Sequence, residues 1–166
     1  MSRRTFPTTA QQHLLRTVRL DLAGPEQIGR WNELIERHHY PHDATLVGEA
    51  LRYVARDEAG AWVALPGYGS ASPHLRVRDE WPGWGPEQRE RRRRLVTRNS
   101  RFLILPGVAC PNLASRLLTL GGQRLATDFP RRHGHPVVLV ESFVDPELYR
   151  GACHQAAGLS RAGRDY

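Results

Sequence analysis

Two short, continuous apolar segments constrain the fold of this chain more than any other feature. One is Arg101-Phe102-Leu103-Ile104-Leu105-Pro106, and the other is Pro136-Val137-Val138-Leu139-Val140-Glu141-Ser142-Phe143. Apolar runs of this length without alternation are typical of strands covered on both faces. Between them, Asn112 is a favoured helix N-cap, and Leu113, Leu117, Leu120 and Leu125 follow with helical spacing. The chain therefore predicts neighbouring, mostly buried strands over residues 101–105 and 137–143, joined by a helix.

The residues before this unit predict a helix, a hairpin and a loop. Pro25 suits a first helical turn, and the apolar face that follows extends to Pro41, which disfavours helix before it. Residues 51–55 and 61–65 are strand-like around the turn sequence Asp57-Glu58-Ala59-Gly60. Residues 66–86, with Trp81 and Trp84, predict a long ordered loop, and Pro86 begins a helix that extends to about Arg98. We expect a last short helix over about residues 146–157.

Length and patterning predict one α/β domain with a mixed central sheet flanked by helices. The 166 residues suit a single domain. We expect a polar N-terminal arm over 1–22, the domain over 23–160 and a C-terminal tail over 161–166. No apolar run approaches the roughly 18 residues of a membrane helix, and residues 1–7 lack the apolar part of a signal peptide. Cys110 and Cys153 form no paired motif, so we expect a cytoplasmic protein without a membrane partner.

The charge of the chain points to an anionic partner. All 24 basic residues are Arg, and the net charge is +7. GC-rich codons explain the choice of Arg over Lys, but they do not explain the positive excess. The simplest interpretation of the charge on the predicted helix after Pro86 is a solvent-exposed helix face. Its charge, with Trp84 as a stacking platform, also predicts DNA or RNA binding. The candidate contact residues are Trp84, Arg89, Arg91, Arg92, Arg93, Arg94 and Arg98.

Histidines, a cysteine and two glutamates are the candidates for metal binding or catalysis. His38, His39 and His42 fit no standard zinc spacing, so we predict no metal site and no cofactor. Cys153 is a candidate nucleophile, but its neighbour His154 points about 100° away along a helix and is not well placed as its base. We therefore favour a small buried residue, the commonest role of a free Cys. Glu49 and Glu141 lie in or beside apolar strands, so each either pairs with Arg52 or Arg101 or serves as a general base.

Several blocks of the sequence resemble the Druantia-type (DruA) family. They are Asn99-Ser100-Arg101-Phe102-Leu103-Ile104-Leu105-Pro106, Pro111-Asn112-Leu113-Ala114-Ser115, Glu141-Ser142-Phe143-Val144-Asp145-Pro146 and Gly151-Ala152-Cys153-His154-Gln155-Ala156-Ala157, with further matches at 30–35, 38–40 and 48–53. The resemblance covers roughly residues 28–158. It implies a role in phage defence or beside transposases, with a possible protein partner in such a system.

The order of elements is also similar to the GNAT acyltransferase fold. In that fold a strand, a loop and a helix cradle the pyrophosphate of CoA on backbone N–H groups. The resemblance implies ligand contacts from Leu105, Gly107, Val108 and Asn112, and a general acid at His154, five residues before Leu159. The turn 107–112 lacks the Gly-x-Gly of CoA enzymes and contains Pro111, which has no N–H. Two hypotheses follow: a nucleic-acid-associated protein that has lost the CoA loop, or an acyltransferase with His154 as acid and Glu49 or Glu141 as base.

Overall fold

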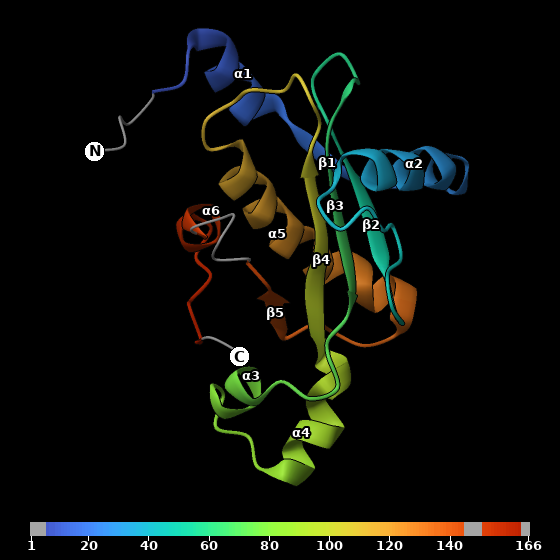
Figure 1. Ribbon diagram of the computed structural model, residues 1–166, viewed down its shortest axis with the longest axis vertical. Helices are drawn as coiled ribbons and strands as arrows, with labels where there is room; N and C mark the ends of the chain where they lie inside the picture. Colours follow the sequence, from blue (N-terminus) through green and yellow to red (C-terminus); the bar gives the residue numbers. More distant parts are fainter. Residues whose placement is uncertain (1–5, 145–150, 164–166) are drawn as a thin grey trace.

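A single five-stranded sheet organises the chain. The computed structural model describes residues 6–144 and 151–163 (Figure 1). The strands lie side by side in chain order: β1 (Arg19–Leu22), β2 (Leu51–Arg56), β3 (Trp62–Ser70), β4 (Val96–Ile104) and β5 (Leu139–Ser142). β1 to β4 pair with one another in antiparallel fashion, and β5 runs parallel to β4. The predicted α/β class with a mixed central sheet is therefore confirmed.

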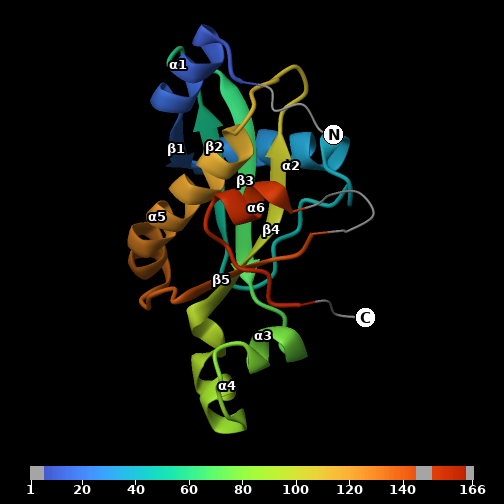
Figure 2. The same cartoon turned by 90° about the vertical axis from the view of Figure 1, so that its left-hand side faces the viewer.

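Helices cover both faces of this sheet. They are α1 (Thr9–Thr17), α2 (Ile28–His38), α3 (Arg76–Glu80), α4 (Pro86–Arg92), α5 (Leu113–His133) and α6 (Ala152–Ala156), with 3-10 turns η1 (Pro25–Gln27) and η2 (Arg93–Leu95). In Figures 1 and 2, α1, α5 and α6 lie on one face and α2 lies on the other, while α3 and α4 extend beyond one end of the sheet. In the described residues, no helix combines the length and apolarity needed to cross a membrane.

Each face of the sheet has its own apolar cluster. On the α5 face, Leu117 and Phe129 of α5 belong to a buried cluster with Tyr53 of β2. On the α2 face, Trp31 and Ile35 are fully buried and pack in a second cluster. A Cβ atom at Gly67 would lie 3.0 Å from the Trp31 ring, so glycine at this position lets the helix approach β3 closely. The apolar periodicity predicted for α2 is thus the packing face of the helix.

The predicted strand–helix–strand unit is present as β4–α5–β5. β5 pairs with the first half of β4, from Val96 opposite Leu139 to Asn99 opposite Ser142. β4 and β5 are neighbours as predicted, but β5 pairs with residues 96–99 and not with 101–105. The expectation that 101–105 and 137–143 are mostly buried is wrong. Most of these side chains are half-buried, and Phe143 is 53% exposed. The reason is that β5 is short and ends at Ser142, so within residues 6–144 and 151–163 no strand pairs with the second half of β4 on that side.

A β-bulge distorts β4 where this pairing stops. The register with β3 shifts from Arg101 opposite Gly67 to Asn99 opposite Tyr68, so Ser100 is the extra residue. The Asn99 side-chain amide donates to the carbonyls of Gly67 (3.3 Å) and Arg101 (3.2 Å). These two hydrogen bonds stabilise the backbone of the bulge. β5 ends at Ser142, opposite Asn99, while β4 continues through residues 100–104. We call the point beside Ser142 where the two segments separate the fork.

Three element predictions need correction. The expected arm over 1–22 contains α1 and the edge strand β1, because Val18 and Leu20 join the core (4% and 5% exposed). The expected loop 66–86 includes the end of β3 and all of α3. The arginine-rich helix stops at Arg92, because Val96 and the residues after it pair in the sheet. For the last helix, α6 covers 152–156, and residues 146–150 lie outside the described residues.

Candidate functional site

Ser142 and His154 meet at the fork between β4 and β5. Ser142 is the last residue of β5, and its Oγ lies 2.9 Å from Nε2 of His154 in α6. Both side chains are half-buried, and burial lowers the pKa of His154. A neutral imidazole in this position can accept the Ser142 proton or return it. Sequence reasoning selected His154 but missed Ser142, although a hydroxyl at the end of an apolar strand was a usable signal.

Cys153 also contacts this histidine. Its Sγ lies 3.4 Å from Nδ1 of His154, so the expectation that the two side chains point too far apart was wrong. The Cβ directions do differ along a helix, but Nδ1 lies close to the backbone and a short neighbouring side chain can reach it. Cys153 is half-buried and forms no disulfide. His154 thus contacts a hydroxyl through one ring nitrogen and a thiol through the other.

The two candidate acids have separate partners. Glu49 pairs with His135 (Oε2–Nε2 2.7 Å), and Glu141 pairs with Arg78 of α3 (3.1 Å). Both partners differ from the expected Arg52 or Arg101, because they come from segments distant in sequence. Glu141 alternates with Ser142 along β5, so it faces away from the Ser142–His154 contact. The structure therefore does not bring Glu49, Glu141 and His154 into one site.

The loop after β4 is held by its own backbone bonds. The N–H of Val108 donates to Leu105 (3.1 Å), and the N–H of Leu113 donates to Cys110 (3.2 Å). Gln11 of α1 donates to the carbonyl of Ala109 (2.7 Å), which fastens α1 to this loop.

Two residues of the loop have left-handed backbones. Gly107 has a φ of 86°, and Asn112 has a φ of 68° at the N-cap of α5. The position predicted for Asn112 is confirmed, but its side chain makes no capping bond because this conformation differs from the extended one that caps use.

The arginines of α4 differ in how they are engaged. Arg89 Nε donates to the carbonyl of Trp84 (2.8 Å), and the Arg92 guanidinium lies 5.4 Å from the centre of the Trp84 ring. Arg91 pairs with Glu87 and Arg93 pairs with Glu90, at 2.7 and 3.5 Å. Arg91, Arg92 and Arg94 are exposed, whereas Arg89 and Arg93 are half-buried.

Arg98 is separate from this helix. It lies on β4, where its guanidinium is 5.0 Å from the centre of the Phe143 ring, and its buried Nε has no hydrogen-bond partner among the described residues. The prediction that it extends the arginine face of the helix is therefore wrong.

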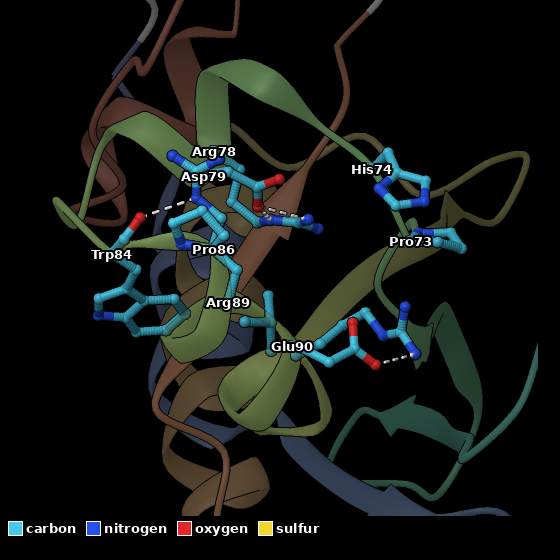
Figure 3. Close-up of a pocket in the computed structure, with 10 residues that line it drawn as sticks. Pro73, His74, Arg78, Asp79, Trp84, Pro86, Arg89 and Glu90 are labelled. Atoms are coloured by element: carbon cyan, nitrogen blue, oxygen red, sulfur yellow. Dashed lines mark hydrogen bonds and ion pairs between the residues drawn. The ribbon is translucent and has the colours of Figure 1, made fainter.

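A pocket of about 220 Å³ lies between α4 and the segment that leads into α3 (Figure 3). Pro73 and His74 line one side, and Trp84 and Pro86 line the other. The rest of its lining comes from Arg78, Asp79, Arg89, Glu90, Arg93 and Val96. All of these residues belong to the single stretch 73–96. The sequence indicated Trp84 as a stacking platform, but it did not predict the pocket that this stretch forms.

The histidines near residue 40 do not converge. The His39 ring accepts the N–H of Phe102 (3.3 Å), while His42 contacts the carbonyl of Glu36 (2.8 Å). Burial, and then the charge of Arg101, lower the pKa of His39. Across residues 6–144 and 151–163, no three His, Cys, Asp or Glu side chains are grouped to hold a metal ion.

Comparison with known proteins identifies the family. A family model described as "Druantia protein DruA" matches residues 11–162. The chain belongs to the DruA family. The matched range of this DruA-family chain includes every strand, and it includes α3 and α4 as well as the fork. No curated protein matches the chain.

A solved structure supports the fold. The DruA-family chain is similar to aminoglycoside antibiotic 6'-N-acetyltransferase AAC(6')-Ih from Acinetobacter baumannii, with a TM-score of 0.54 and 13% sequence identity. The match covers 90% of this chain and 95% of that chain. At this identity the likeness shows the fold alone, and it confirms the GNAT-like build.

Proposed function

We propose that this DruA-family protein binds nucleic acid through α4, as part of a phage-defence or mobile-element system. The observation that carries the proposal is the exposure of Arg91 and Arg92 on α4, which extends beyond the sheet (Figure 1), and of Arg94 in the 3-10 turn η2 that follows it. Guanidinium groups match phosphate geometry and bind it in pairs of hydrogen bonds. On the same surface, the Arg92 guanidinium lies 5.4 Å from the centre of the Trp84 ring. The family suggests a defence or mobile-element context, with a possible protein partner.

The ion pairs on α4 leave its charge available. Arg91 and Glu87 are each 77% exposed, and exposed pairs of this kind contribute only about 0.2–1 kcal/mol. A phosphate can therefore compete for Arg91 at little cost. Among residues 89–94, five are Arg and one is Glu, so the local balance is strongly positive. Long-range attraction to a polyanion then adds to direct contact.

A charge reversal on α4 tests the proposal. The variant Arg91→Glu/Arg92→Glu/Arg94→Glu should lose most of its affinity for DNA and RNA, because it replaces three phosphate donors with carboxylates. Its melting temperature should stay close to that of the wild type, because the three side chains are exposed. Fluorescence anisotropy and thermal unfolding measure the two quantities.

A matched control separates the helix from the net charge. Arg116, Arg131 and Arg132 are exposed on α5, so reversing all three changes the net charge equally at another place. We expect this control to weaken binding much less. Equal losses in the two variants would mean that α4 is not the binding surface.

We also propose that the loop 105–112 no longer binds CoA. Two of its N–H groups are bonded internally, at Val108 and Leu113, and Pro111 has none to offer. A pyrophosphate needs such donors free at the helix N-terminus. Isothermal titration with acetyl-CoA and CoA should show no binding in the micromolar range. Micromolar affinity would overturn this proposal and favour the second candidate function.

The second candidate is acyl transfer at the fork, and the Ser142–His154 contact is the observation that favours it. Acetyl transfer is the activity in the name of AAC(6')-Ih, whose fold this chain shares. In this candidate, His154 gives a proton to the leaving group of an activated acyl donor. Glu49 and Glu141 are held in ion pairs elsewhere, so neither is placed as its base. Loss of thioester turnover in His154→Gln and Ser142→Ala would support it; equal turnover would exclude it.

A further inference from the structure

We infer that the pocket between Trp84, Pro86 and Pro73 takes an unpaired nucleobase, so that α4 recognises single-stranded nucleic acid (Figure 3). This inference rests on the proposed function, because the exposed arginines of α4 must hold the backbone of the same strand. The pocket adds a second mode of contact beside charge.

The size and walls of the pocket suit one planar ring system. Its volume of about 220 Å³ is below the roughly 300–1,000 Å³ of sites for drug-sized ligands. Trp84 offers an aromatic face, and Pro73, Pro86 and Val96 add apolar surface. Every base has a π-face, so stacking of this kind tolerates any sequence.

The polar groups of the pocket suit a base edge better than a phosphate. Asp79 and Glu90 are acceptors, while His74, Arg89 and Arg93 are potential donors. Asp79 also pairs with Arg78 of the lining (2.7 Å), so the pocket combines both charges. A base edge presents both donors and acceptors and can use both kinds of group, whereas a phosphate could use only the donors. The Glu90–Arg93 pair is long (3.5 Å) and partly exposed, so both groups can turn to a ligand.

The surroundings of the pocket place phosphate donors beside it. The Arg92 guanidinium lies 5.4 Å from the centre of the Trp84 ring. Arg91 is exposed on the same helix, and Arg94 is exposed in η2, which follows it directly. A strand can therefore put one base into the pocket while its phosphates contact these arginines. In a duplex, the base is stacked and paired, and extruding it costs energy. Single strands should for this reason bind more tightly than duplexes of the same sequence.

Trp84 variants and an abasic probe test the inference. Fluorescence anisotropy compares a labelled single strand of about 12 nucleotides, within the usual range of site sizes, with an abasic strand that has the same phosphates. Trp84→Leu should bind the normal strand about 5- to 150-fold more weakly, the range for loss of one stacked base. It should bind the abasic strand as the wild type does, and Trp84→Phe should keep most of the affinity.

Trp81 provides the matched control. It is 56% exposed in the same segment, but it does not line the pocket. Trp81→Leu should therefore cost much less than Trp84→Leu. Equal losses at the two positions, an equal loss by Trp84→Leu on both probes, or no loss at all would overturn the pocket assignment. If wild-type protein binds neither strand at low salt, the proposed function itself fails.

Discussion

At the scale of single residues, Arg78 and Glu141 form a buried ion pair that ties α3 to β5. Both side chains are 8% exposed, and Arg78 also donates to the carbonyl of Ser72 (2.8 Å). Removing one member of such a pair leaves the other charge buried without a counter-charge. Arg78→Met should lower the free energy of unfolding by about 3–5 kcal/mol. Urea denaturation measures this loss.

The double variant is the control for this ion pair. In Arg78→Met/Glu141→Leu no charge of the pair remains buried, so part of the loss should be recovered. The recovery should be incomplete, because Asp79 also loses its ion pair with Arg78 (2.7 Å). A single variant that costs less than about 1 kcal/mol would show that Glu141 keeps access to water or to another partner.

Two histidines make stability depend on pH. Burial lowers the pKa of both His39 and His154 below the ordinary value of 6.5. The unfolded chain therefore takes up these protons first as the pH falls. The contribution of these two histidines to the free energy of unfolding should be fully present above about pH 6.5. It should be lost as the pH falls from there to the lowered pKa of the folded state.

The difference between variants isolates this effect. Unfolding free energies from pH 7.5 to 5.5 should fall less steeply for His39→Gln/His154→Gln than for the wild type, because fewer protons are taken up on unfolding. Parallel curves for the two proteins would contradict the assignment.

Residue roles were only partly accessible from the sequence. The apolar strands around Glu49 and Glu141 correctly indicated that each acid needs a partner. Their partners, His135 and Arg78, come from segments 86 and 63 residues away. No local pattern encodes such a pairing, because the topology of the sheet creates it.

At the scale of elements, the N-terminal segment is part of the core. Leu20 of β1 is 5% exposed, whereas Leu22 on the same strand is 39% exposed. Leu20→Ala should cost about 2–5 kcal/mol of unfolding free energy, as buried leucines do. Leu22→Ala should cost less than half as much. If both changes were nearly neutral in urea denaturation, this segment would be the loose arm that its polar sequence suggests.

The elements that the sequence predicted well have strong local signals. α2, the β2–β3 hairpin and β4–α5–β5 have clear periodicity or unbroken apolar runs, and all are present. α1 and β1 were missed because they are short and polar, and only Val18 and Leu20 reach the core. The end of α4 was misplaced because five arginines favour helix, whereas the pairing of Val96 with β5 decides the strand.

At the scale of the whole molecule, the fold separates two candidate sites. The fork with Ser142 and His154 lies on the α6 face of the sheet, and the pocket with Trp84 lies at the end formed by α3 and α4 (Figures 1 and 2). The buried pair of Arg78 and Glu141 connects the two regions, because Glu141 precedes Ser142 and Arg78 lines the pocket. Variants at Trp84 or His154, which are not members of this ion pair, can therefore test each site separately.

The salt dependence of nucleic-acid binding tests the central claim most directly. Fluorescence anisotropy of the wild-type protein with a labelled single strand should give a log K that falls linearly with log salt. For about four phosphate contacts, the slope should be near −2.8, from roughly −0.7 per phosphate of a single strand. Absence of binding at low salt would contradict the account, because the arginines of α4 would then have no polyanion to contact.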